Sequence, residues 1–177
     1  MMKTENELWE ACKAFHGHAC GGLAIGFKAA LYAKELLQED KAADEEIVCV
    51  SENDACGVDA IQVILICTAG KGNLIFHMTG KQAFSFYSRK SGKSFRLLLK
   101  PHQSGSREES LNYYRHTDHH ELFTVMETKI TLPDEARIFR SVVCDQCHEK
   151  TAENYIHLEN GRCLCPDCYK KYTRPLL

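Results

Sequence analysis

The stretch "ACGGLAIGFKAALYAKELLQ", residues 19–38, decides the fold of this chain. Leu23, Phe27 and Leu31 recur at steps of four, and this spacing predicts a helix over residues 21–38. Gly26 and several alanines leave the predicted helix slim, so we expect it to pack closely against a sheet or another helix. The stretch therefore predicts a core in which this helix is central.

The segments on either side of this helix predict a mixture of helices and strands. Helical spacing predicts a helix over 5–14, and the short β-branched segment 45–52 is typical of a buried strand. Residues 57–67 are apolar on nearly every side. They favour a central helix, although their periodicity also allows a strand.

The following segments add strands. Residues 73–89 predict a hairpin around the Thr79-Gly80-Lys81 turn, and 93–100 predict another strand. Residues 101–121 are polar and predict a loop leading into a short exposed helix, after which 136–144 predict a strand. This order favours the α+β class, with a mixed or antiparallel sheet packed against helices, over a doubly wound sheet.

Composition indicates an ordinary globular protein with an unusual number of thiols. The 177 residues are 44% apolar and 26% charged with a net charge of −2, so no basic field points to nucleic acid. No apolar run reaches the roughly 18 residues of a membrane span, and the N-terminus lacks the apolar region of a signal peptide. We therefore expect a cytoplasmic protein, in which ten cysteines indicate metal ligands or reactive thiols before disulfides.

The cysteines of the C-terminal part follow a zinc-binding template. Cys144-x2-Cys147 is followed after 17 residues by Cys165-x2-Cys168. Such pairs place four thiolates around one tetrahedral ion and close its shell, which predicts a structural zinc. Cys163 is expected to be a bystander. The sequence thus predicts a core domain over 1–140 and a small zinc finger over 141–177.

A second group of metal-ligand residue types lies directly before the central helix. "FHGHACGG", residues 15–22, places His16, His18 and Cys20 within five positions. Cys56 also lies between a predicted strand and a predicted helix, so the two helix starts can converge and share a zinc. The helix dipole would favour the charged form of both thiols, and Asn53 or Asp54 could orient a histidine.

The remaining cysteines and histidines have simpler interpretations. Cys12, Cys49 and Cys67 lie inside apolar patterns and are expected to be small buried hydrophobes. The histidine cluster at 116–120 lies in polar surroundings and is interpreted as a solvated helix end.

Three motifs together resemble the FmdE family, which takes its name from formylmethanofuran dehydrogenase. They are "FHGHACGGLAIGFKAA", "CGVDAIQVILICTAGKGNL" and "GKQAFSFY", and the resemblance covers roughly residues 8–140. Gly21 replaces a proline that is common in the family. The C-terminal "GRCLCPDCY" is similar to the treble-clef zinc finger appended in some members.

The resemblance implies an α+β core with a bound metal, and a homodimer. It places the polar site on His16, His18, Cys20 and Cys56, each as metal ligand or catalytic group. Asp59, Lys71 and Asn73 are implied as neighbours of that site.

The sequence leaves three functions open. The first is a zinc-binding protein, with one ion in the core and one in the finger, accessory to a molybdenum- or tungsten-dependent oxidoreductase of one-carbon metabolism. The second is an independent enzyme that uses metal-activated water or a thiolate of Cys20 or Cys56, with His16 or His18 as base. The third is a regulatory module whose finger binds a protein; the sparse basic residues argue against nucleic acid as its partner.

Overall fold

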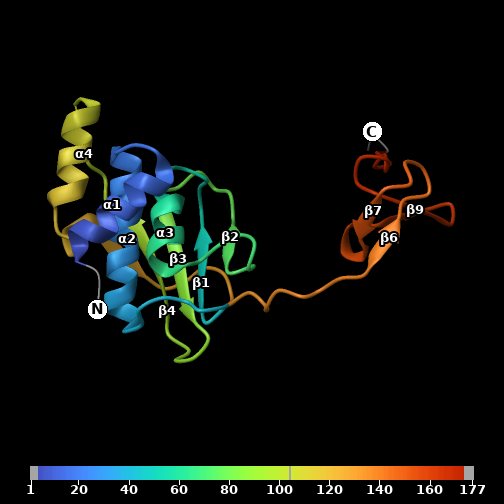
Figure 1. Cartoon of the computed structure of the whole chain (residues 1–177), viewed down its shortest axis with the longest axis horizontal. Helices are drawn as coiled ribbons and strands as arrows, with labels where there is room; N and C mark the ends of the chain where they lie inside the picture. The colour runs from blue at the N-terminus through green and yellow to red at the C-terminus, as the bar shows by residue number, and fades with distance from the viewer. Residues whose placement is uncertain (1–3, 104, 174–177) are drawn as a thin grey trace. The chain divides into compact units, whose positions relative to one another are not determined.

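The computed structural model of this protein describes residues 4–103 and 105–173, in two compact units, 1–136 and 137–177 (Figure 1). The larger unit is an α+β domain with helices packed on an open mixed sheet. The smaller unit carries a four-cysteine cluster that fits a small zinc finger. These features confirm the predicted fold class. Within the described ranges, the helices are all too short or too polar to cross a membrane.

The two N-terminal helices form where the sequence predicts them. Helix α1 (Glu5–His16) begins with a capping box in which Thr4 and Glu7 satisfy each other's backbone N–H groups. It ends at Gly17, whose φ of 92° is in the left-handed region that glycine adopts without strain. Helix α2 (Gly21–Leu37) follows after a short turn, so the two helices are linked through the histidine-rich segment.

Helix α3 (Gly57–Leu65) packs directly against α2, which settles the ambiguity over 57–67 in favour of a helix. The backbones touch at Gly26 and Gly57, where a Cβ on Gly26 would overlap the carbonyl oxygen of Gly57. This close crossing brings the N-terminal ends of the two helices together. Cys20 and Cys56, which directly precede those ends, therefore lie beside each other.

The larger unit contains a five-stranded sheet in the order β2-β1-β3-β4-β5. The first strand pairs in parallel with the second, and all other neighbouring pairs are antiparallel. The strands are β1 (Ile47–Ser51), β2 (Leu74–Phe76), β3 (Ala83–Ser88), β4 (Ser94–Leu99) and β5 (Phe123–Met126).

The predicted hairpin over 73–89 is wrong, because β2 and β3 lie on opposite sides of β1. Cys49 is paired with Leu74 on one side and with Phe86 on the other. The connection does not turn back on itself. Instead, the N–H groups of Thr79 and Gly80 donate to the carbonyl of Glu52, which carries the chain across the end of β1.

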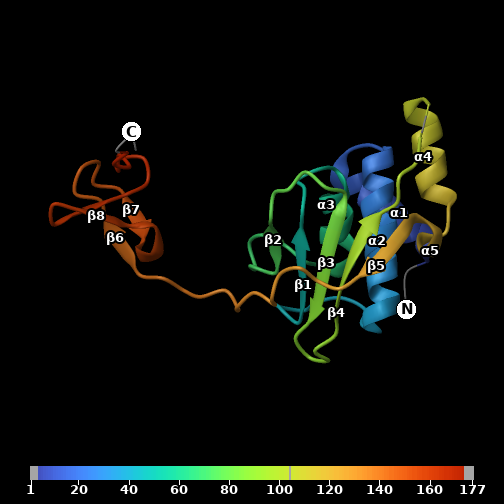
Figure 2. The same cartoon turned by 180° about the vertical axis from the view of Figure 1, so that it is seen from behind.

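The two faces of the sheet are covered by different parts of the chain. Helices α1, α2 and α3 cover one face, where Phe84 and Phe86 contribute to the main core (Figure 1). The other face carries Val48, Val50 and Tyr87, and the irregular segment after β5 crosses it (Figure 2). The Tyr87 hydroxyl donates to the carbonyl of Ile130 at 2.6 Å. Both faces of the central strands are therefore buried.

An ion pair is buried at the end of β1. The Arg96 guanidinium donates to both carboxylate oxygens of Glu52, at 2.5 and 3.0 Å, and Arg96 is 1% exposed. The Thr79 hydroxyl donates to the same carboxylate at 2.9 Å. The hydrogen bonds from Arg96 lower the pKa of Glu52, against the opposing effect of burial. This charge pair fixes the β2–β3 connection to β4.

Two further helices pack beside α2. They are α4 (Arg107–His116) and α5 (His119–Leu122), and Tyr114 and Leu122 are buried in the main core. The exposed helix predicted to follow the polar loop is α4. Strand β5 comes directly after α5, in a place where the sequence pattern predicts no strand.

The smaller unit contains short strands around its cysteines. Its elements are β6 (Ser141–Val143), β7 (Lys150–Ala152), the 3-10 turn η1 (Glu153–Tyr155), β8 (His157–Glu159) and β9 (Arg162–Leu164). Strand β6 pairs with β7, and β8 with β9. The strand predicted over 136–144 is therefore too long, because residues 136–140 are irregular.

Candidate metal site

The segment between α1 and α2 places three metal-ligand side chains together. His16 is the last residue of α1, and His18 and Cys20 lie in the short connection that begins after Gly17. One ligand atom of each residue lies within 4.8 Å of the others. The structure therefore brings together the three residues that the sequence pattern predicts for this site.

His16 is oriented by a carboxylate that lies on another helix. Its Nδ1 lies 2.7 Å from Oδ2 of Asp59, and its Nε2 lies 3.8 Å from the Cys20 sulfur. Gln62 donates to the other oxygen of Asp59 at 3.2 Å, which fixes the carboxylate in turn. When the Asp59 carboxylate accepts the proton on Nδ1, the lone pair of Nε2 faces the thiol, as metal-binding histidines require.

The orienting residue differs from the one expected from sequence. The side chain of Asn53 donates to the carbonyl of Lys81 and accepts from the N–H of Ala55, so it orients no histidine. Asp54 is exposed. The signal for Asp59 was its position three residues after Cys56, which is one helical turn into α3.

The two thiols of the site contact each other. The Cys20 sulfur caps α2 by accepting from the N–H of Leu23 at 3.3 Å, and the Cys56 thiol interacts with that of Cys20. Burial, and then the neighbouring Cys20, raises the pKa of Cys56. The expectation that the helix start favours a thiolate is therefore wrong for Cys56. A divalent cation would reverse this effect, because thiolates bind it directly.

Lys71 and Asn73, which the family resemblance placed near the site, lie elsewhere. The Lys71 ammonium donates to the carbonyl of Asp44 at 2.8 Å, and the Asn73 amide donates to those of Asp44 and Ile47. These contacts are at the opposite end of β1 from Glu52. Both residues therefore stabilise loops around the sheet.

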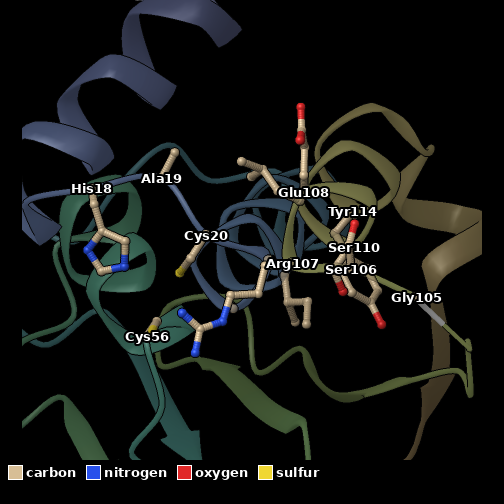
Figure 3. Close-up of a pocket in the computed structure, with 14 residues that line it drawn as sticks. His18, Ala19, Cys20, Cys56, Gly105, Ser106, Arg107, Glu108, Ser110 and Tyr114 are labelled. Carbon is tan, nitrogen blue, oxygen red and sulfur yellow. The ribbon is translucent and has the colours of Figure 1, made fainter.

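A cleft of about 900 Å³ opens beside the thiols. His18, Cys20 and Cys56 line one side of it, and the first two turns of α4 line the other (Figure 3). Its floor includes Gly21, Gly22, Ile25 and Leu111. This volume is in the range of pockets that bind small molecules.

The donor set fits a zinc ion. Thiolate sulfur and imidazole nitrogen are the ligands that zinc prefers, and tetrahedral bonds of about 2.0 to 2.3 Å place such ligands roughly 3.5 Å apart. The separation of 3.8 Å between His16 Nε2 and the Cys20 sulfur is close to that spacing. His16, His18, Cys20 and Cys56 are therefore residues that could hold the metal.

The four cysteines of the smaller unit form a second cluster. One sulfur each of Cys144, Cys147, Cys165 and Cys168 lies within 4.8 Å of the others. Backbone N–H groups of Cys147 and Cys165 lower the pKa of Cys144 to about 6. Burial, and then the other thiols, raises the pKa of Cys168 to about 12. Four such thiols ionise together only around a cation, so the cluster fits a structural metal site.

The other cysteines are structural. Cys12, Cys49 and Cys67 are each 0% exposed, which confirms that they are buried hydrophobes. Burial raises the pKa of Cys12 to about 12, so this thiol stays protonated. Cys163 lies outside the four-cysteine cluster.

Two histidines of the polar cluster interact with α2. Nε2 of His119 and of His120 each lies 2.9 Å from an oxygen of Glu35, and Nδ1 of His120 lies 2.6 Å from Asp118. Hydrogen bonding to Asp118, and then to Glu35, raises the pKa of His120. The histidines are thus paired with carboxylates at the surface.

Comparison with known proteins agrees with this architecture. A crystal structure of an FmdE-like protein from Syntrophus aciditrophicus, described for a tungsten formylmethanofuran dehydrogenase, superposes with a TM-score of 0.67. The two sequences are 23% identical, and the match covers 94% of this chain and 92% of that chain, so the fold is shared. A probable S-adenosyl-L-methionine-binding protein from Archaeoglobus fulgidus is 36% identical over 91 residues.

That match covers 49% of this chain, and the chain spans only 25% of the length of the Archaeoglobus protein. The sequence model for FmdE, described by the molybdenum formylmethanofuran dehydrogenase operon, matches residues 15–153. The matched range contains the histidine-rich segment, Cys56 and the entire sheet. This chain belongs to the FmdE family.

Proposed function

We propose that this protein binds zinc in its core and handles a small molecule in the adjoining cleft, as an accessory component of a molybdenum- or tungsten-dependent oxidoreductase of the formylmethanofuran dehydrogenase type. A second zinc holds its finger, which we propose to be a treble clef. The protein would act in the cytoplasm, in one-carbon metabolism.

The observation that supports this proposal best is the convergence of His16, His18 and Cys20 beside Cys56, at the edge of a cleft of about 900 Å³. Structural zinc sites are closed, whereas sites that serve chemistry keep a position accessible to water or substrate. His18 is exposed and the two thiols are partly exposed. An ion held by these residues would therefore face the cleft.

The residues of the chain supply the remaining requirements of such a site. A bound zinc would act as a Lewis acid toward a molecule in the cleft. Asp59 holds His16 in one orientation through Nδ1, at 2.7 Å. A histidine that is oriented in this way serves as a ligand through Nε2, or as a general base if His18 and the two thiols suffice for the metal.

The association with an oxidoreductase is supported by the family. Its model is described by the molybdenum formylmethanofuran dehydrogenase operon, and the similar Syntrophus protein is described as tungsten FmdE-like. Proteins encoded together with an enzyme commonly act on the same substrate or supply the same cofactor. The Archaeoglobus relative, described as a probable S-adenosyl-L-methionine-binding protein, also agrees with a small-molecule site.

The cleft supports a second candidate, an independent enzyme. A protein that only stabilised a partner would need no pocket of this volume beside two thiols and two histidines. In this alternative, metal-activated water or a thiolate of Cys20 or Cys56 is the nucleophile. Turnover of a small molecule by the purified chain alone, lost in Cys20→Ser, would favour the enzyme over the accessory role.

Metal stoichiometry tests the core site. The purified chain is expected to bind two equivalents of zinc, and a Cys20→Ser, Cys56→Ser double variant one equivalent. Cys12→Ser is the matched control, since Cys12 is 0% exposed and lies outside the metal-ligand clusters of the described residues. If the wild-type chain and the double variant both bind one equivalent, the core holds no tight metal, and a reactive thiol pair becomes the better interpretation.

We also propose that the protein is a homodimer. Large apolar side chains are exposed at both edges of the sheet, with Phe76 and Met78 near β2 and Val125 and Met126 on β5. Apolar surface of this kind commonly lies in an interface. Light scattering at micromolar concentration tests this, and a mass near 20.1 kDa would contradict it.

A further inference from the structure

The wall of the cleft opposite the thiols is formed by the beginning of α4. Ser106, Arg107 and Ser110 from this helix line the cleft, together with Tyr114 one turn further along. Their polar groups therefore face the same space as Cys20 and Cys56 (Figure 3). A molecule bound between the two walls would contact the metal-ligand residues on one side and α4 on the other.

Arg107 is the residue of this wall with a formal positive charge. Figure 3 shows its side chain extending across the cleft toward Cys56, while the neighbouring Glu108 points away from the thiols. Among the described residues, Arg107 has no partner in a hydrogen bond or an ion pair. Its guanidinium is therefore free to bind a group that enters the cleft.

The other arginine of α4 shows that this is not the rule for the helix. Arg115 donates to Glu5 at 2.8 Å and to Asn6 at 3.0 Å, and its guanidinium lies 5.2 Å from the Trp9 ring centroid. That arginine holds α4 against α1. Arg107, two turns earlier, has no such structural role.

A guanidinium binds a carboxylate or a phosphate through two parallel hydrogen bonds, a geometry that lysine cannot reproduce. The hydroxyls of Ser106 and Tyr114 line the same wall and can donate further hydrogen bonds to an oxyanion. The apolar floor at Ile25 and Leu111 suits a short carbon chain between the two ends.

We propose that Arg107 recognises an oxyanion group, a carboxylate or a phosphate, of the small molecule that binds in this cleft, and thereby places the rest of that molecule against Cys20 and Cys56. This inference rests on the proposed function of the cleft as a small-molecule site. It makes Arg107 a specificity residue for anionic ligands.

Paired alkylating agents test this inference without knowledge of the natural ligand. Iodoacetate and iodoacetamide both transfer a two-carbon group to a thiolate with loss of iodide, but only iodoacetate carries a carboxylate. The rates at Cys20 and Cys56 are measured by peptide mass spectrometry, with Cys163 as the reference thiol. The full chain is used as purified and, in parallel, after treatment with EDTA, so that a bound metal cannot hide the thiols.

The expected result is a ratio of iodoacetate to iodoacetamide rates about fivefold higher at the cleft thiols than at Cys163, a preference of the size that a charged hydrogen bond gives. Arg107→Gln should remove this preference and leave the iodoacetamide rate unchanged. Arg107→Lys should keep only part of it. Glu108→Gln is the matched control, because it changes the charge of the adjacent residue without a contact to the anion.

Two outcomes would overturn the inference. In one, Arg107→Gln keeps the wild-type ratio. In the other, Glu108→Gln raises the ratio as much as Arg107→Gln lowers it, which indicates only a general effect of charge. Inorganic phosphate separates the two ligand groups. If it slows the reaction with iodoacetate in the wild type and not in Arg107→Gln, the site accepts phosphate, and if it has no effect, the recognised group is a carboxylate.

Failure of this inference is distinguishable from failure of the proposed function. The alkylation ratio reports on Arg107 whether or not the core holds a metal. The zinc stoichiometry of the Cys20→Ser, Cys56→Ser variant reports on the metal alone.

Discussion

Gly26 of α2 lies directly against Gly57 of α3, with no room for a side chain between them. The contact holds the two helices at backbone distance and places Cys20 and Cys56 beside each other at the helix starts. The glycine in the middle of α2 therefore determines the geometry of the site six residues away.

Substituting Gly26 tests this relationship. Gly26→Ala is expected to lower the free energy of unfolding by about 1–3 kcal/mol, because the added methyl overlaps the backbone of Gly57. The separation of the helices should also weaken metal binding at the core site. Gly70→Ala is the control, since a Cβ there meets nothing within 4 Å. A fully stable Gly26→Ala protein would show that the helices can separate without cost.

Asp59→Asn tests the orientation of His16. Loss of the charged acceptor at 2.7 Å from Nδ1 is expected to reduce the zinc affinity of the core site about tenfold. Competition with a chromophoric chelator measures this affinity. Asp54→Asn removes an exposed carboxylate nearby and should leave the affinity unchanged. Equal losses in both variants would mean that only the local charge matters.

The buried pair of Glu52 and Arg96 makes a specific prediction about stability. Arg96→Met is expected to destabilise the protein by about 3–5 kcal/mol, because it leaves the Glu52 carboxylate buried without its partner. Adding Glu52→Gln should recover much of this loss, since a neutral amide needs no counter-charge. Chemical denaturation followed by Trp9, the one tryptophan of the chain, measures both variants. Additive losses in the double variant would refute this account.

The same pair predicts how stability depends on pH. The pKa of Glu52 is lowered below 4.5 in the folded protein by its hydrogen bonds with Arg96. The folded state therefore binds fewer protons at this group than the unfolded state does, so the pair contributes stability above pH 4.5. That contribution should be lost as the pH falls through the folded pKa, and the Glu52→Gln, Arg96→Met variant should lose less stability over this range.

Cys147→Ser separates the two units of the chain. It is expected to remove one equivalent of zinc and to make residues 141–173 sensitive to protease, because a finger of this size derives most of its folding free energy from the metal. The transition reported by Trp9 should not move. Cys163→Ser should retain both the metal and the protease resistance. Full zinc content in Cys147→Ser would rule out the four-cysteine site.

The sequence predicted those elements whose pattern is local. The helices over 5–16 and 21–37 and the strand 47–51 follow from apolar spacing and from caps within a few residues. The residues of the candidate site were also found, because His16, His18 and Cys20 are adjacent in the chain. Asp59 was recognised only as a neighbour, since the side chain that it orients lies 43 residues away.

Other elements depended on partners that a local pattern does not show. Strand β2 pairs in parallel with β1, and this choice between β1 and β3 is made by long-range packing. Strand β5 was missed because only Phe123 of its four residues is buried. Arg96 was placed inside a predicted strand without any sign that Glu52, 44 residues away, would neutralise it.

The order of strands also has a consequence for synthesis of the chain. Strand β1 leaves the ribosome before both strands that flank it, so neither of its edges is paired until residue 88 has been made. Its five residues are entirely buried in the finished domain. A nascent or truncated chain that ends between β1 and β3 therefore exposes an apolar strand with two open edges, the kind of surface that seeds aggregation.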